Sequence, residues 1–218
     1  MGTRKKQAAD ELQKVAAGKF SEWLRGAEAS LQSGKGGTAV PCGTCTACCR
    51  SSMFIHIAPE ETKTIQRIPR ALLFAAPGRP KGHLLMGYSD KGHCPMLVEN
   101  KCSIYEDRPQ TCRDYDCRVF AATDIPVDQK AQPAIAERVK AWVFDFESEE
   151  SRKELQTVKA AASFLQQHRD LFPQNSLPSH PAQLAAIAVR IHKLFSPRTV
   201  ETDTALAEAI LTALNRTP

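Results

Sequence analysis

The sequence predicts an α+β protein in which a small cysteine-rich module with short strands is flanked by helices. Three observations indicate this. All eight cysteines of the 218-residue chain lie between Cys42 and Cys117. Short β-type runs separated by turn residues occupy that window. The flanking sequence instead spaces its apolar residues three and four apart, as amphipathic helices do. We therefore divide the chain into an N-terminal amphipathic helix and linker (1–37), a cysteine module (38–120) and a C-terminal helical region (121–218).

Residues 4–32 are predicted to form one helix or a broken pair of helices. Their apolar side chains recur mostly at helical steps: Leu12, Val15, Ala16, Phe20, Trp23, Leu24, Ala27 and Leu31. Gly18 and Gly26 weaken the pattern, and the glycine-rich run 33–37 ends it. The polar face carries both signs of charge, which favours packing on the protein over binding at a membrane.

The cysteine module is predicted to contain short elements joined by turns. In chain order they are a strand at 53–57, a helix from Pro59 to about Ile68, a basic loop at 77–82, a strand at 84–88, a hairpin built from 94–98 and 102–105, and a helical turn bearing Cys112 and Cys117. Beyond residue 119 the pattern becomes helical, with predicted helices at 134–146, 148–171, 181–195 and 203–214. Ser148 is the expected N-cap of the second, because acidic residues follow it in the first turn.

Composition narrows the classes of partner. The formal net charge is +5, and basic and acidic residues are interleaved along the chain, which disfavours nucleic acid as a partner. There is no run of about 18 apolar residues, so no membrane partner is expected. We see no signal peptide and expect a cytoplasmic protein. Because that compartment keeps thiols reduced, clustered cysteines indicate metal ligands before disulfides.

The spacing of the first four cysteines is typical of a metal site. Cys42, Cys45 and Cys48 form two overlapping C-x2-C pairs, which let a tight turn aim two sulfurs at one ion. Thiolates suit zinc, in tetrahedral sites of four sulfurs, and equally iron–sulfur clusters, whose ferredoxin loops share this local spacing. The sequence alone leaves both metals open.

Cys49 departs from the ferredoxin run, which would place the next cysteine three residues further on and before a proline. Adjacent cysteines on an extended chain point in opposite directions, so Cys48 and Cys49 are expected to serve two centres. Three alternatives stay open: one metal held by three or four of the cysteines, a thiol redox sensor built on Cys48 and Cys49, and a disulfide cluster.

The combined motifs resemble the CxxCxxCC cysteine-cluster family, which is also called YkgJ-like and is described as a zinc- or iron-chelating domain. The resemblance covers about residues 40–118. It rests on the CxxCxxCC run at 42–49, the Gly-x-Cys-Pro-x-Leu run at 92–97, and the Cys-Ser-Ile-Tyr-x2-Arg-Pro-x2-Cys-Arg run at 102–113. Flagellin lysine methylases contain a similar cysteine region. The resemblance implies metal chelation, with an enzymatic precedent for some relatives.

All eight cysteines are candidate metal ligands: Cys42, Cys45, Cys48, Cys49, Cys94, Cys102, Cys112 and Cys117. Arg108 and Arg113 are expected to lie beside the thiolates and offset their negative charge, with surface salt bridges as the alternative. His93, and to a lesser degree His56, could replace a thiol at zinc.

The function predicted from the sequence is chelation of zinc or iron by the cysteine cluster. The alternative is an iron–sulfur or iron-dependent enzyme, for example one with a methylase-like activity on protein. No catalytic residue is assigned. Besides the metal ion, a protein is the expected kind of partner.

Overall fold

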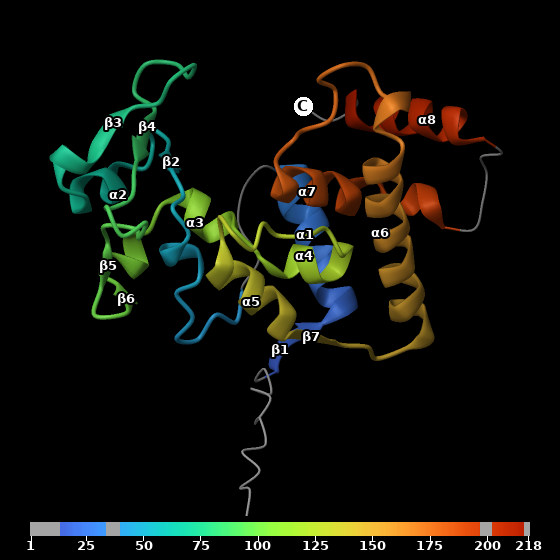
Figure 1. Cartoon of the computed structure of the whole chain (residues 1–218), viewed down its shortest axis with the longest axis horizontal. Coiled ribbons are helices and arrows are strands. Elements are labelled where there is room, and N and C mark those ends of the chain that lie inside the picture. The colour runs from blue at the N-terminus through green and yellow to red at the C-terminus, as the bar shows by residue number, and fades with distance from the viewer. Residues whose placement is uncertain (1–13, 34–39, 197–201, 216–218) are drawn as a thin grey trace, which may run out of the picture.

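A computed structural model describes residues 14–33, 40–196 and 202–215 of the chain. Two parts lie side by side in Figure 1. One, which we call the cysteine body, comprises residues 40–117 and contains short strands. The other, the helical body, comprises residues 14–33 and the described residues from 118 onward. The mixture of helices and small sheets confirms the predicted α+β class.

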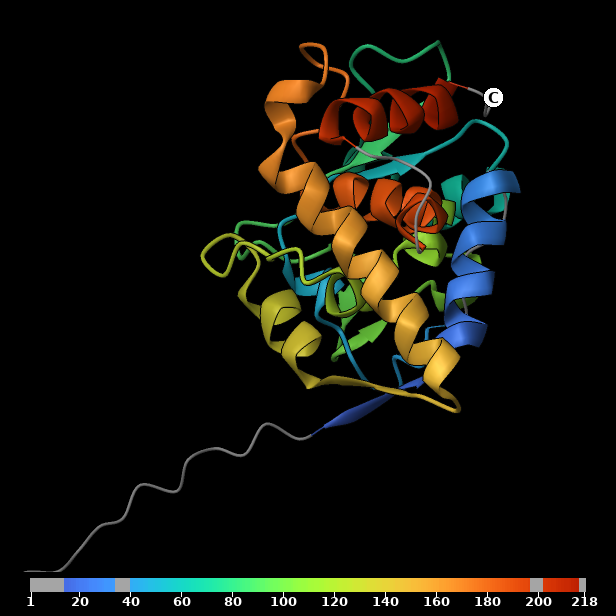
Figure 2. The ribbon, with the colours of Figure 1, turned by 90° about the vertical axis from the view of Figure 1, so that its right-hand side faces the viewer.

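The helical body is built around two long helices that pack on each other, α6 (Glu149–Gln167) and α7 (Pro181–Ile191). Around them lie the other helices and 3₁₀ turns of this body: α1 (Phe20–Ser33), α4 (Arg118–Thr123), α5 (Pro133–Ala141), η4 (Arg169–Leu171), η5 (His192–Phe195) and α8 (Asp203–Asn215). Figure 2 shows α6 crossing the molecule diagonally, with α1 at one side and α8 across its upper end.

Sequence and structure agree at α6. The Ser148 hydroxyl accepts a hydrogen bond from the Ser151 N–H at 3.2 Å, and Ser151 Oγ accepts one from the Ser148 N–H at 3.3 Å. This reciprocal cap, with Glu149 and Glu150 in the first turn, begins the helix where the sequence predicted.

A parallel pair of strands replaces two stretches predicted as helix. Strand β1 (Val15–Lys19) pairs with β7 (Trp142–Asp145), and a register shift lies at Ala16–Gly18. Gly18 adopts a φ of 89°, which a right-handed helix does not allow. The helix predicted across 4–32 is therefore wrong over 15–19 and correct from Phe20; residues 4–13 lie outside the described residues. The helix predicted at 134–146 ends at Ala141.

The cysteine body contains a three-stranded antiparallel sheet in the order β2 (Ile55–Ile57), β4 (Leu84–Met86), β3 (Leu73–Ala75). Helix α2 (Thr62–Arg67) and the turn η2 (Arg70–Leu72) connect its first two strands in the chain. The strands at 53–57 and 84–88 and the helix after Pro59 were predicted. Strand β3 was not.

The predicted hairpin is present as β5 (Leu97–Val98) and β6 (Lys101–Cys102). Its turn residues Glu99 and Asn100 both have positive φ, at 47° and 60°, as a tight two-residue hairpin turn requires. The turn η3 (Tyr105–Asp107) and helix α3 (Gln110–Asp114) lead from the hairpin toward the helical body.

Candidate metal centre

The eight cysteines come from four separate segments that meet where the cysteine body joins the helical body. Four lie in the loop leading into the 3₁₀ turn η1 (Cys48–Arg50), two in the hairpin segment, one in α3 and one directly before α4. All eight are free thiols. Helix α5 packs against η1, so the helical body forms one wall of this region.

Backbone hydrogen bonds hold the first cysteine loop against the hairpin segment. The Cys94 N–H donates to the Cys49 carbonyl at 2.7 Å, and the Ser52 N–H donates to the Gly92 carbonyl at 2.8 Å. Gly92 has a φ of 73°, and a Cβ there would lie 2.4 Å from Ser52 Oγ. A glycine at this position therefore allows the two loops to approach closely.

We call Cys49, Cys94, Cys102 and Cys112 the hairpin group. Burial, and after it the neighbouring sulfurs of Cys48, Cys94 and Cys102, raise the pKa of the Cys112 thiol to about 12. The pKa of Cys94 is raised by burial and by Cys102. These mutual effects indicate that the sulfurs of this group are neighbours.

We call Cys42, Cys45 and Cys117 the N-terminal group. Burial, and after it the charges of Asp116, Cys42 and Cys45, raise the pKa of Cys117 to about 12. The Trp142 indole N–H donates to Cys117 Sγ at 3.2 Å and opposes that rise, because it stabilises the thiolate.

Cys48 stands between the two groups. A hydrogen bond from the Cys49 thiol lowers the pKa of Cys48 to about 7, and the charge of Arg108 contributes to that decrease. The Cys48 sulfur in turn raises the pKa of both Cys42 and Cys112. For each of these thiols its effect is second in size to that of burial. The residues form a 3₁₀ turn, so the premise of an extended chain with opposed side chains is wrong, and the two thiols contact each other.

The family of this region follows from comparison with known sequences. Residues 41–138 match the family model CxxCxxCC, whose description is "putative zinc- or iron-chelating domain". This segment is therefore similar to CxxCxxCC domains. The match confirms the resemblance predicted from the motifs and extends beyond residue 118 through most of α5. No curated protein and no solved structure matched the chain.

Metal binding is the property that the family match supports. Within the matched segment the donor set also fits a soft metal, since eight free thiols are gathered in one region. In the described part of the chain, no three His, Cys, Asp or Glu side chains already have the arrangement that encloses an ion. The thiols would therefore have to adjust their side-chain rotamers around the metal.

The two arginines predicted beside the cluster differ in what they contact. The Arg108 guanidinium lies over the Tyr105 ring, 4.0 Å from its centroid, and lowers the pKa of Cys48 and Cys112 against burial. Arg113 instead donates to the Arg108 carbonyl at 3.1 Å and to the Glu106 carbonyl. Arg108 is thus placed to offset thiolate charge, while Arg113 fixes the loop that carries it.

Two further residues of the site were not identified from the sequence. The Arg138 guanidinium stacks over the Trp142 ring at 4.2 Å, and its charge opposes the rise that burial and the neighbouring thiols cause in the pKa of Cys42. Its Nε–H is buried and donates to no partner among the described residues. Neither residue belongs to a cysteine motif. The only available signal was their place just after the motif window, within or next to a helix.

The histidines lie differently from the cysteines. His56 Nε2 is 2.9 Å from His83 Nδ1, and the two rings stack with centroids 5.0 Å apart. The imidazole of His56 therefore contacts His83 on the sheet, and its Nε2 faces that ring. The backbone of His93 pairs with Ser89, which fixes the turn before Cys94.

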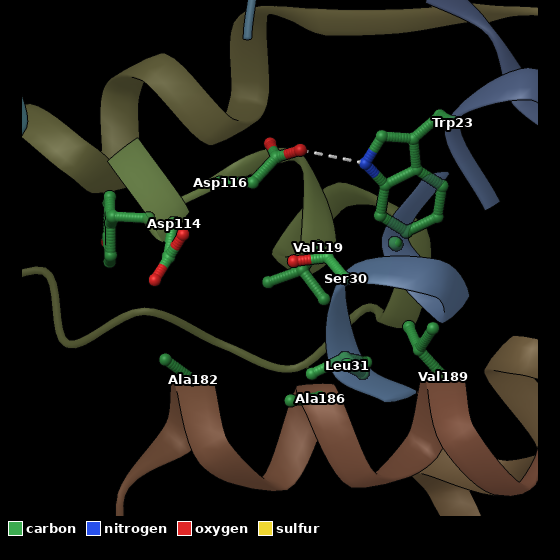
Figure 3. Close-up of a pocket in the computed structure, with 11 residues that line it drawn as sticks. Trp23, Ser30, Leu31, Asp114, Asp116, Val119, Ala182, Ala186 and Val189 are labelled. Atoms are coloured by element: carbon green, nitrogen blue, oxygen red, sulfur yellow. Dashed lines mark hydrogen bonds between the residues drawn. The ribbon is translucent and has the colours of Figure 1, made fainter. Parts of the chain in front are cut away.

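A pocket of about 140 Å³ lies beside the segment that joins Cys112 to Cys117 (Figure 3). Its walls come from α1, α7 and residues 114–119, and are mainly apolar. On one wall, Asp116 Oδ2 accepts a hydrogen bond from the Trp23 indole N–H at 2.9 Å, as the dashed line shows. A cavity of this size holds a group about as large as benzene. None of the described helices is long and apolar enough to cross a membrane.

Proposed function

We propose that this protein binds zinc or iron through its eight thiols, in two neighbouring thiolate centres. The observation that carries the proposal is the convergence of eight free cysteines from four chain segments, with mutual effects on their pKa values. Such a set needs a compartment that keeps thiols reduced, as the cytoplasm does.

The hairpin group would supply one complete set of four ligands. The N-terminal group supplies three sulfurs, and Cys48 would complete it because its sulfur acts on Cys42. Cys49, whose backbone carbonyl is bonded to the Cys94 N–H, stays with the hairpin group. This division assigns the adjacent cysteines to different centres even though their thiols touch in the metal-free chain.

Charge supports the placement of one arginine near each centre. A zinc ion with four thiolates keeps a charge of about −2, which is costly to bury without compensation. Arg108 acts on Cys48 and Cys112, and Arg138 acts on Cys42. Each guanidinium can donate hydrogen bonds to sulfur while it offsets that charge.

Anaerobic purification followed by metal analysis and an absorption spectrum tests the proposal. Two equivalents of zinc in a colourless sample, or of iron without labile sulfide, agree with two thiolate centres. A brown sample that contains iron and labile sulfide identifies iron–sulfur clusters instead of mononuclear ions. A purified protein that contains no metal and takes up none contradicts the proposal.

Single substitutions test the division into two centres. Cys112→Ser and Cys117→Ser are each expected to lose one of two metal equivalents, and the double variant both. Cys48→Ser is expected to behave as Cys117→Ser, and Cys49→Ser as Cys112→Ser. Loss of all metal in either single variant would instead indicate one shared cluster.

A second candidate, an iron–sulfur or iron-dependent enzyme, is favoured by the apolar pocket beside residues 114–116. A substrate group there would lie next to the chain segment between two ligands. Redox-active iron and binding of a benzene-sized probe that Ala186→Phe blocks would support this candidate. Stoichiometric zinc alone argues against it.

A further inference from the structure

The outer face of the three-stranded sheet carries an exposed group of aromatic side chains. The opposite face packs into the core of the cysteine body through Ile55, Ile57 and Met86. Because strand residues alternate between faces, His56, Phe74 and Leu85 point outward, and the register places Leu85 opposite both of the others. Phe54 continues the outer face beyond the end of β2.

Three aromatic rings on this face contact one another yet stay open to solvent. Phe54, Phe74 and Tyr88 are 56%, 44% and 43% exposed. The Phe54 centroid lies 6.0 Å from that of Phe74 and 5.1 Å from that of Tyr88. A Cβ on Gly87 would contact the rings of Phe54 and Phe74 at 3.6 and 3.7 Å, so the Gly87 backbone lies directly beside both rings.

A basic loop borders the same face. Residues 76–83 join β3 to β4 and carry Arg79 and Lys81, both exposed. At the end of this loop His83 Nδ1 lies 2.9 Å from His56 Nε2. The pKa of His56 is lowered by burial, then by His83 and by the charge of Arg79. The nearby carboxylate of Glu61 is occupied by two backbone N–H groups, at 2.8 and 2.6 Å.

The segment of sequence that forms much of this sheet is basic. From Lys63 to Ser89 the sequence contains five Lys and Arg residues and no Asp or Glu, which equals the formal net charge of the whole chain, +5. Among the described residues, the ion pair from Arg67 to Asp107 is the one that involves this segment. The interleaving of basic and acidic residues therefore fails in this segment.

We propose that this sheet face binds single-stranded nucleic acid, with bases stacked on Phe54, Phe74 and Tyr88 and phosphates held by Arg79 and Lys81. Exposed rings on an open sheet face are a surface on which unpaired bases stack, and a basic rim attracts the backbone. The site is separate from the thiol cluster, and the inference does not depend on which metal is bound.

Charge favours this occupant over an apolar protein segment or a second copy of the chain. A second copy would bring the same basic loop toward the face and meet like charge, which opposes association. An apolar segment would use the rings but leave the basic loop without a counter-charge. A single strand of nucleic acid would contact the rings through its bases and the basic loop through its phosphates.

Fluorescence anisotropy tests the proposal with the full-length, metal-containing protein. The probes are labelled oligonucleotides of about 12 units, oligo(U) RNA and oligo(dT) DNA, which fit the usual footprint of a stacking platform, and a duplex of equal length. Saturable binding to single strands, stronger than to the duplex, is expected at low salt. Tighter binding of RNA identifies contacts to the 2′-hydroxyl; equal binding identifies a site for either strand.

Two substitutions at one exposed position separate stacking from general apolar contact. Phe54→Leu keeps an apolar side chain but removes the ring, and is expected to weaken binding about tenfold. Phe54→Trp keeps a stacking surface and should retain the affinity of the original chain. Val143→Ala, an exposed apolar change on β7, is the matched control and should have no effect. Circular dichroism and metal content verify that each variant folds.

The basic loop is tested through salt. Replacing Arg79 and Lys81 by alanine should reduce the slope of log affinity against log salt by about 0.7 for each lost phosphate contact. The proposal is overturned if single strands do not bind at low salt, if the duplex binds equally well, or if Phe54→Leu binds as the original chain does. Dimerisation abolished by Phe54→Leu, without nucleic-acid binding, would identify an interface between copies instead.

Discussion

The cysteine body and the helical body reach stability by different routes. The helical body contains two clusters of 14 and 9 buried apolar residues, formed by long helices that pack on each other. The cysteine body contains one cluster of 6, held by strands of two or three residues. So small a core rarely folds alone, whereas structural metal supplies folding free energy directly. The comparison indicates that bound metal stabilises the fold of the cysteine body, whereas apolar packing stabilises the fold of the helical body.

The largest expected effect is that of metal removal, which should destabilise the cysteine body far more than the helical body. A chelator under reducing conditions is expected to unfold the cysteine body and to leave α6 and α7 folded, because a structural thiolate site contributes on the order of 10 kcal/mol. Hydrogen exchange should show loss of protection in β2–β6 and retention in the helical body. Equal loss in both bodies would show that they unfold as one unit.

The next largest expected effect is the loss of stability when a buried ion pair between the two bodies is removed. The Arg118 guanidinium is 5% exposed, lies 2.7 Å from Asp116 Oδ2 and donates to the Ala17 carbonyl on β1 at 2.8 Å. Arg118→Ala leaves a buried carboxylate without its cation and should cost about 3–5 kcal/mol in urea unfolding. Lys159→Ala is the control, since it removes a more exposed ion pair with Asp124 at 2.7 Å and should cost less than about 1 kcal/mol.

A matched pair of core truncations compares the bodies directly. Leu165 in α6 and Ile57 in β2 are both 0% exposed. With metal bound, Leu165→Ala and Ile57→Ala should each lower stability by about 2–5 kcal/mol. After chelation, the first should still destabilise the remaining transition and the second should not. An effect of Ile57→Ala on the metal-free transition would mean that the cysteine body stays folded without metal.

The smallest expected effect concerns pH and Cys117 in the metal-free chain. Cys117 is the last residue of the cysteine body but packs against the core clusters of the helical body. Burial raises the pKa of Cys117 to about 12, above the ordinary thiol value near 8.5. Above pH 8.5 the unfolded chain therefore loses this proton before the folded chain does, and stability falls as pH rises. Loss of about 1.4 kcal/mol is expected at about pH 9.5. Urea midpoints should show it, and Cys117→Ala should flatten the dependence; an unchanged slope in that variant would assign the effect to another group.

Local signals predicted the parts of the fold that local contacts determine. The cap at Ser148 identified α6, and the turn at Glu99 and Asn100 identified the hairpin. Strands β1 and β7 were predicted as helix because their stabilising contact is with each other, across most of the chain. No periodicity within either segment records that pairing.

The candidate site divides in the same way. Residue type and spacing found the eight thiols and the nearby Arg108, whose guanidinium acts on Cys48 and Cys112. Arg138 and Trp142 were missed, because α5 and β7 bring them to the cluster only after the helical body has packed. The ligand assignments and the division into three chain segments stay predictions.

The two tryptophans of the chain give the domain a built-in optical label. The Trp23 indole donates to Asp116 and the Trp142 indole to Cys117, so both chromophores report on one pair of adjacent residues. The hairpin group has no such neighbour. Quenching of tryptophan fluorescence during a titration with metal should therefore follow binding at the N-terminal group alone. Comparison with the total metal bound would then give the order in which the two centres fill.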